Sequence, residues 1–147
     1  MANLREKVDV ELENISIVLA ELEKIKDKSD KTTAELAGMG TFLHNFYTGI
    51  ENILKQILHD IGIPTPSSSS WHRDLLILAS EENIITMTTR KRLAKYLAFR
   101  HFFVHAYSFL LDERELKLLV DDVFDAYRAF EEETDTFISK KRQWKLQ

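Results

Sequence analysis

Apolar residues recur along this chain at steps of three and four, which is the period of an α-helix packed on one side. The first stripe predicts a helix from Leu4 to Ile25. A second stripe predicts a helix that begins at Thr32 and extends to Ile61. Glu35 stands three residues after Thr32 and completes the capping-box pattern of a helix start.

The second half of the chain shows the same period after one clear interruption. Residues 62–70 contain a glycine, two prolines and four serines, and this composition predicts a loop. A short helix is expected over residues 71–80 and a long one over 88–111. The last helix should begin at Asp112, because Glu115 again gives a capping pattern. These segments predict a single all-α domain spanning residues 1–147, an antiparallel bundle of four long helices and one short helix.

Composition narrows the function. The 147 residues are 44% hydrophobic and 30% charged, with no Cys, four Gly and two Pro. The absence of Cys excludes disulfides and Cys-ligated metals, and the small number of glycines argues against a Gly-rich nucleotide loop. No cofactor is expected. No apolar run is long enough for a membrane span, and the charged amino terminus is unlike a signal peptide. We expect a soluble cytoplasmic protein without membrane contact.

The net charge of −4 argues against non-specific nucleic-acid binding by the whole chain, but its distribution is uneven. Between residues 90 and 100 there are five cations and no acid. Four of these cations are candidates for contact with RNA, or alternatively form an ordinary solvated helix face; they are Arg90, Lys91, Arg92 and Lys95.

Arg100 breaks the apolar pattern of the fourth predicted helix. It falls in the middle of the stripe that we expect to face the core, which is formed by Leu93, Leu97, Val104, Tyr107 and Leu111. Burying this cation unpaired costs several kcal/mol, so it needs a carboxylate partner, a subunit boundary or a water-filled cleft. Glu51, Asp121 and Asp122 are candidate partners. The neighbouring residues are aromatic or apolar on nearly every side, which indicates that a second copy of the chain covers this helix.

Residues 100–107 read Arg-His-Phe-Phe-Val-His-Ala-Tyr, an R-x4-H-x-Y pattern. This motif resembles the signature of HEPN-domain ribonucleases, most closely the HepT-like toxins, and residues 42–51 and 71–76 also resemble segments of such chains. The resemblance implies a homodimer that cleaves RNA without a metal, at a cleft where the two motifs meet. It implies that Arg100 and His105 are catalytic, with His101 as a supporting polar residue. It also implies a nucleotidyltransferase antitoxin of the MntA type that AMPylates Tyr107.

The chemistry of metal-free RNA cleavage suits these residue types. It needs a base for the 2′-hydroxyl, an acid for the leaving oxygen and positive charge at the phosphate. Histidine supplies the first two near neutral pH, and arginine binds phosphate through paired N–H donors. Arg100 and His105 are separated by about 140° around an ideal helix, so one straight helix does not aim both at one phosphate. Two copies at a symmetric cleft remove this difficulty.

Other interpretations remain open from the sequence. The chain fits a non-catalytic HEPN module that binds a nucleotidyltransferase or a nucleotide, and it fits a purely structural helical dimer in which Arg100 is an interfacial ion-pair partner. His101 and His105, four residues apart, also share a helix face from which a metal can be bound. A second tier of cleft candidates, which equally fits residues that cap or bridge helices, comprises His44, Asn45, His72 and Arg73.

Overall fold

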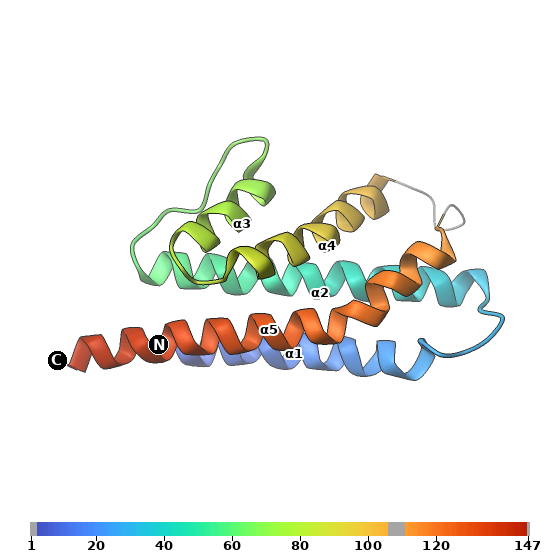
Figure 1. Cartoon of the computed structure of the whole chain (residues 1–147), viewed down its shortest axis with the longest axis horizontal. Coiled ribbons are helices and arrows are strands. Elements are labelled where there is room, and N and C mark those ends of the chain that lie inside the picture. The colour runs from blue at the N-terminus through green and yellow to red at the C-terminus, as the bar shows by residue number, and fades with distance from the viewer. Residues whose placement is uncertain (1–2, 106–110, 147) are drawn as a thin grey trace.

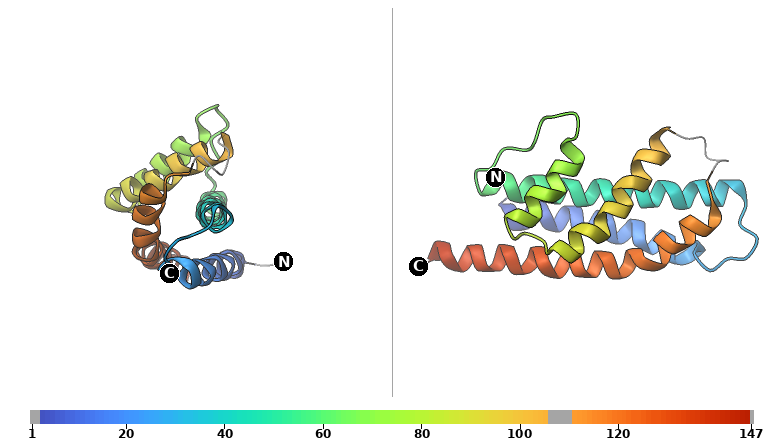
Figure 2. Two further views of the ribbon diagram at one scale, coloured as in Figure 1. Left: turned by 90° about the vertical axis from the view of Figure 1, so that its right-hand side faces the viewer. Right: turned by 45° about the horizontal axis from the view of Figure 1, so that its top comes forward.

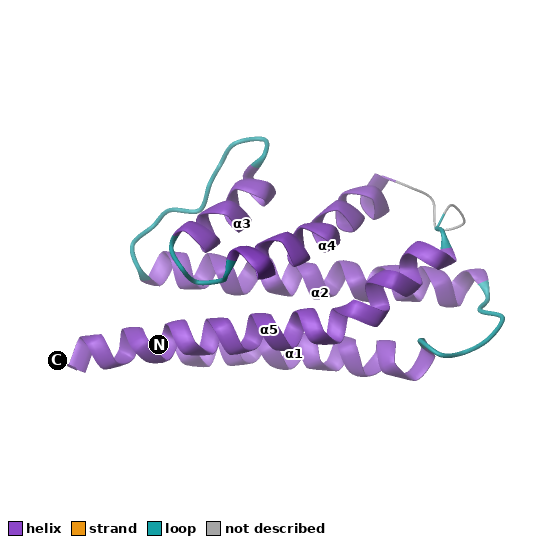
Figure 3. Cartoon of the chain, viewed as in Figure 1, coloured by secondary structure: helices purple, strands orange, loops and turns teal. Residues whose placement is uncertain are grey.

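The computed structural model describes residues 3–105 and 111–146, and these are helical with no strand (Figures 1 and 3). The all-α prediction is therefore confirmed. The helices are α1 (Leu4–Ile25), α2 (Thr33–Asp60), α3 (Trp71–Glu81), α4 (Met87–His105) and α5 (Glu113–Leu146). Within the described ranges, no helix contains a stretch that is apolar and long enough to cross a lipid bilayer.

The four long helices alternate in direction along the chain, as predicted for an antiparallel bundle. In Figure 1, α1 and α4 run toward one end of the bundle and α2 and α5 run back. The short helix α3 lies beside α4, and both pack on α2 (Figure 2). Since α2 contacts each of the other four helices, it carries the broadest apolar surface and forms the centre of the core.

Local capping fixes where the helices begin. The Thr32 hydroxyl accepts from the Glu35 N–H at 3.1 Å, and the Glu35 carboxylate accepts from the Thr32 N–H at 2.9 Å. The predicted capping box of α2 is thus confirmed. At α5 the Asp112 carboxylate accepts from the Arg114 N–H at 2.9 Å. Each cap satisfies backbone donors that a helix start leaves unpaired.

The predicted end of the fourth helix is wrong. Leu111 is not helical, so the helix does not extend as far as predicted. The described part of α4 ends at His105, and residues 106–110 lie outside the described residues. Apolar residues continue at helical spacing through residue 111, so the pattern contains no signal for an end before it.

An ion pair between Arg92 and Asp122 ties α4 to α5. Their closest nitrogen and oxygen are 2.6 Å apart, and Tyr96 donates to the Leu119 carbonyl at 2.8 Å beside them. The hydrogen bond from Arg92 lowers the pKa of Asp122. The contribution of Asp122 to stability is therefore present above the ordinary pKa of an aspartate, about 4, and is lost as pH falls through the lowered value.

We expect Asp122→Asn to lower the free energy of unfolding by about 1–2 kcal/mol at pH 7, because a half-buried, charge-assisted contact is weakened. The difference from wild type should shrink below about pH 4. Urea unfolding at both pH values measures this. Asp121→Asn is the matched control, since Asp121 pairs with Lys117 in an exposed i,i+4 contact and should change stability by less than about 0.5 kcal/mol. Equal effects of the two substitutions would contradict this account.

Candidate functional site

The inner face of α4 packs directly on α2. Leu93 and Tyr96 are buried, and the Phe103 ring lies against Gly40, where a Cβ atom would be 2.5 Å from the ring. Gly40 thus lets the two helices approach closely. The expectation that Val104 faces the core is wrong, because its side chain is 55% exposed. Two stripes of α4 have helical spacing, and the buried one carries Phe103 in place of Val104.

Arg100 lies half-buried on this inner face, as its position in the stripe predicts. Its Nε atom is shielded from solvent and has no hydrogen-bond partner within residues 3–105 and 111–146. The three carboxylates considered as partners are engaged elsewhere: Glu51 with His72, Asp121 with Lys117 and Asp122 with Arg92. Among the described residues, no carboxylate lies within ion-pair distance of Arg100, so its charge remains available to a ligand.

A layer of polar side chains from α2 and α3 lies behind Arg100. Tyr47 is fully buried, and one turn further along α2 the buried Glu51 carboxylate lies 2.7 Å from His72 Nδ1 on α3. Burial, followed by the neighbouring Glu51, raises the pKa of Tyr47, whereas the nearby Arg100 charge opposes this shift. Trp71 stacks on His72 with ring centroids 3.6 Å apart. Glu51 is therefore connected to the start of α3, and Tyr47 lies near enough to Arg100 to be affected by its charge.

The two motif histidines lie on the opposite, outward face of α4. His101 and His105 are both exposed, and their ring centroids are 4.9 Å apart. Because α4 is continuous from residue 100 to residue 105, Arg100 and His105 point in different directions, as the spacing predicts. One copy of the chain does not bring them together. The same outward face presents Lys91, Ala94, Lys95, Ala98 and Phe102, all of them exposed.

The four cations considered for RNA contact divide into two pairs. Arg92 is held by Asp122, and Arg90 donates to the Ser80 hydroxyl at 3.0 Å. These two side chains connect α4 to its neighbours. Lys91 and Lys95 are exposed one turn apart, on the face that carries the histidines. Only the lysine pair therefore presents its charges freely to solvent on that face.

The second-tier candidates are not gathered into one cluster. His72 belongs to the polar layer, and His44 lies beside Phe103, with ring centroids 6.1 Å apart. Asn45 and Arg73 are exposed. Arg73 lies 3.9 Å from Asp74, whose pKa is lowered by the Ser68 and Ser70 hydroxyls.

Tyr107, the expected modification target, lies outside the described residues. In the described part of the chain, no group of three or more His, Asp or Glu side chains is arranged to hold a metal ion. The pair formed by His101 and His105 thus has no third protein ligand there.

Tyr47 and Glu51 are the site residues that sequence reasoning missed, apart from naming Glu51 as a partner of Arg100. A signal for them exists in the spacing of polar residues on α2. His44, Tyr47, Glu51 and Lys55 recur every three or four positions on the helix that forms the centre of the core. A polar stripe on a core helix indicates a buried polar layer, because each member needs a partner when it leaves water.

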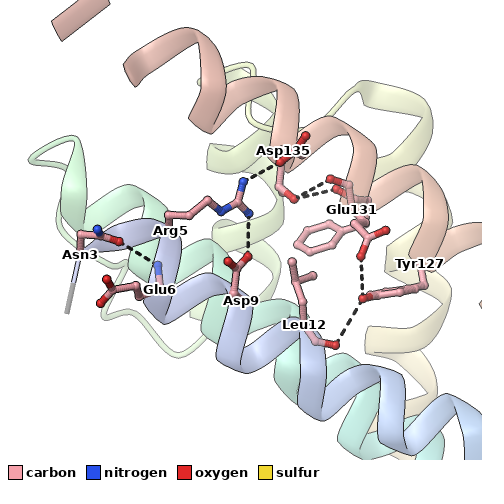
Figure 4. A network of polar contacts seen from close by, with 10 residues as sticks. Asn3, Arg5, Glu6, Asp9, Leu12, Tyr127, Glu131 and Asp135 are labelled. Carbon is pink, nitrogen blue, oxygen red and sulfur yellow. Dashed lines mark hydrogen bonds and ion pairs between the residues drawn. The ribbon is translucent and has the colours of Figure 1, made fainter. Parts of the chain in front are cut away.

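Two hollows in the surface lie at the other end of the bundle, around Lys141, and include none of the predicted site residues. The larger, of about 890 Å³, is bordered by the α3–α4 connection and α5. The other, of about 780 Å³, includes Arg5, which is held by Asp9 and Asp135 (Figure 4).

Comparison with known proteins places the fold and the family. No curated protein matches the chain. A solved structure titled as a cytosolic protein of unknown function, YutE from Bacillus subtilis, is similar with a TM-score of 0.75 at 19% identity, covering 93% of this chain and 92% of that one. This likeness concerns the fold alone. The sequence model described as "HepT-like protein" matches residues 38–141, which include most of α2, all of α3 and α4, and most of α5. The chain therefore belongs to the HepT-like protein family.

Proposed function

We propose that this protein is the toxin of a toxin–antitoxin pair, a metal-independent endoribonuclease that acts as a homodimer through Arg100 and His105. Family membership supports this, since the HepT-like family is of the HEPN nuclease type. The observation that carries the proposal is the environment of two side chains of α4. In the part of the chain that the structure describes, this helix holds a half-buried arginine without a carboxylate partner and, on its outward face, a solvent-exposed histidine of the same motif.

The proposed reaction uses the chemistry of these two side chains. A histidine removes the proton of the ribose 2′-hydroxyl, and the resulting oxygen attacks the adjacent phosphorus. The bond to the 5′-oxygen breaks as that oxygen takes a proton from a second acid. Arg100 stabilises the negative charge that builds up on the phosphate. The products are a 2′,3′-cyclic phosphate and a 5′-hydroxyl.

Dimerisation solves a geometric problem in this mechanism. Arg100 and His105 point in different directions within one copy, whereas at a two-fold axis Arg100 of one copy acts beside His105 of its partner. Water serves as the second acid. The outward face of α4 suits such pairing, because Ala94, Ala98, His101 and His105 follow the 4–3–4 spacing of a helix seam. Exposed small residues there allow close approach of a second α4. Phe102, which is 45% exposed, adds apolar surface beside this seam.

Inhibition is proposed to occur at Tyr107, two residues beyond His105 in the motif. A nucleotidyltransferase antitoxin of the MntA type transfers AMP to its hydroxyl. The added phosphate is negative and the added base is bulky, so both compete with RNA for the cation of Arg100. Lys91 and Lys95 are the proposed electrostatic contacts to the RNA backbone.

The test is cleavage of total cellular RNA by wild type and His105→Ala, with excess EDTA present. Wild type should cleave, and the substitution should slow cleavage by at least about 100-fold, because the base or acid is removed. Circular dichroism should show no change, since His105 is exposed. His59→Ala, which alters another exposed histidine outside the motif, is the control and should retain activity.

Three other results would contradict the proposal. Cleavage that requires added metal would replace the mechanism, and cleavage that survives in His105→Ala would remove His105 from it. No cleavage by a wild type of unmodified intact mass would favour the non-catalytic HEPN module. A mass increased by whole AMP units would instead identify an inhibited toxin, and removal of AMP should then restore cleavage.

A further inference from the structure

Two buried polar atoms, the Nε of Arg100 and the hydroxyl of Tyr47, have no hydrogen-bond partner among the residues that the structure describes. An unpaired buried polar group is costly, so folded proteins seldom retain one without a reason. These two atoms are complementary, because the Nε–H group can only donate and a phenol oxygen can accept. Arg100 is also near enough for its charge to favour the ionised form of Tyr47.

The Glu51 carboxylate is a suitable hydrogen-bond acceptor for the Tyr47 O–H group. Glu51 lies one helical turn further along α2, is only 3% exposed, and raises the pKa of Tyr47. Glu51 is in turn fixed by His72 Nδ1 at 2.7 Å, and the His72 ring is held by stacking on Trp71. The far end of this series is therefore rigid.

We propose that Tyr47, backed by Glu51 and His72, is the positioning residue for Arg100. In the working state, Arg100 Nε–H donates to the Tyr47 oxygen, and the Tyr47 O–H donates to Glu51. These two contacts together pair both buried atoms. The two terminal nitrogens of the guanidinium then remain free to bind phosphate as a fork. This inference rests on the proposed function, since it gives Arg100 its orientation for the RNA phosphate.

Positioning of this kind matters because a misplaced cation stabilises a developing charge poorly. Arg100 has no carboxylate within ion-pair distance among the described residues, so no other contact of that type fixes its guanidinium. The Tyr47 anchor acts on the edge of the guanidinium that faces away from substrate. It therefore orients the charge without competing for it.

Tyr47→Phe is the decisive variant, because it removes one oxygen and keeps the buried ring. We expect kcat for RNA cleavage to fall about ten- to hundredfold, with KM changed less than about threefold and Tm unchanged or raised. Tyr127→Phe is the matched control. The Tyr127 hydroxyl does have partners, the Leu12 carbonyl at 3.3 Å and Glu131 at 3.0 Å (Figure 4), so its loss should lower Tm and leave kcat unchanged.

A second measurement tests the anchor without using activity. The NMR signal of the Arg100 Nε–H, identified by its loss in Arg100→Lys, should exchange with water at least about tenfold more slowly in wild type than in Tyr47→Phe. Equal exchange rates, or an unchanged kcat in Tyr47→Phe beside an active wild type, would overturn the inference. Absence of cleavage by wild type would contradict the proposed function, and the exchange rates would still decide whether Tyr47 anchors Arg100.

Discussion

Mixing two inactive variants, Arg100→Ala and His105→Ala, should restore RNA cleavage. If Arg100 of one copy acts beside His105 of the other, a heterodimer of the two variants contains one complete site and one site lacking both residues. Random exchange makes half of the dimers heterodimers, so about a quarter of wild-type activity should return. The expectation follows from the orientation of the two side chains, since Arg100 faces α2 while His105 is exposed on the other side of α4. Co-expression followed by EDTA-treated cleavage assays measures the recovery.

Native mass spectrometry of the mixed sample provides the necessary control, because it shows whether heterodimers have formed. A second control combines Arg100→Ala with the double variant Arg100→Ala/His105→Ala, a mixture in which no complete site can arise. Activity should stay at background there. If heterodimers form between the single variants and no cleavage returns, Arg100 and His105 act within one copy, and α4 must then change shape to bring them together.

The helices of this fold were predictable because their signals are local. The bounds of α1 follow from its apolar stripe, and the start of α2 follows from Thr32 and Glu35, whose side-chain contacts are three residues apart. Such contacts depend on the chain near them and not on the rest of the fold. The half-buried position of Arg100 was also predictable, because Arg100 shares a helix face with apolar residues that pack on the core.

The surroundings of Arg100 were not predictable, because they depend on how helices distant in sequence meet. Apolar residues near Arg100 lie on more than one side of α4, so spacing alone does not distinguish the stripe through Phe103 from the stripe through Val104. The stripe through Phe103 is the buried one because Gly40 leaves space for the Phe103 ring. In the same way, Glu51 could be named as a partner for Arg100, but only the packing of α3 shows that Glu51 contacts His72 instead.

Gly49→Ala should destabilise the protein, although alanine is the better helix former. A Cβ atom at residue 49 would lie 2.6 Å from Cγ1 and 2.9 Å from Cδ1 of Ile15, which is itself only 1% exposed. Overpacking of this kind costs about 1–3 kcal/mol, which exceeds the gain of roughly 1 kcal/mol in helix propensity. Gly38→Ala on the same helix should instead stabilise by about 0.5–1 kcal/mol, because nothing lies within 4 Å of its added Cβ. Urea unfolding of both variants measures the difference in sign.

The cause of the Gly49 effect can be isolated by removing its neighbour. In the background of Ile15→Ala, itself destabilising by about 2–5 kcal/mol, the clash is absent and Gly49→Ala should become neutral or stabilising. A double-mutant cycle over Gly49 and Ile15 therefore gives a coupling free energy of about 1–3 kcal/mol, whereas the same cycle over Gly38 and Ile15 gives none. If Gly49→Ala stabilises the wild-type protein as Gly38→Ala does, α1 and α2 are not in close contact at this crossing. Glycine at residue 49 would then serve some purpose other than close approach of Ile15.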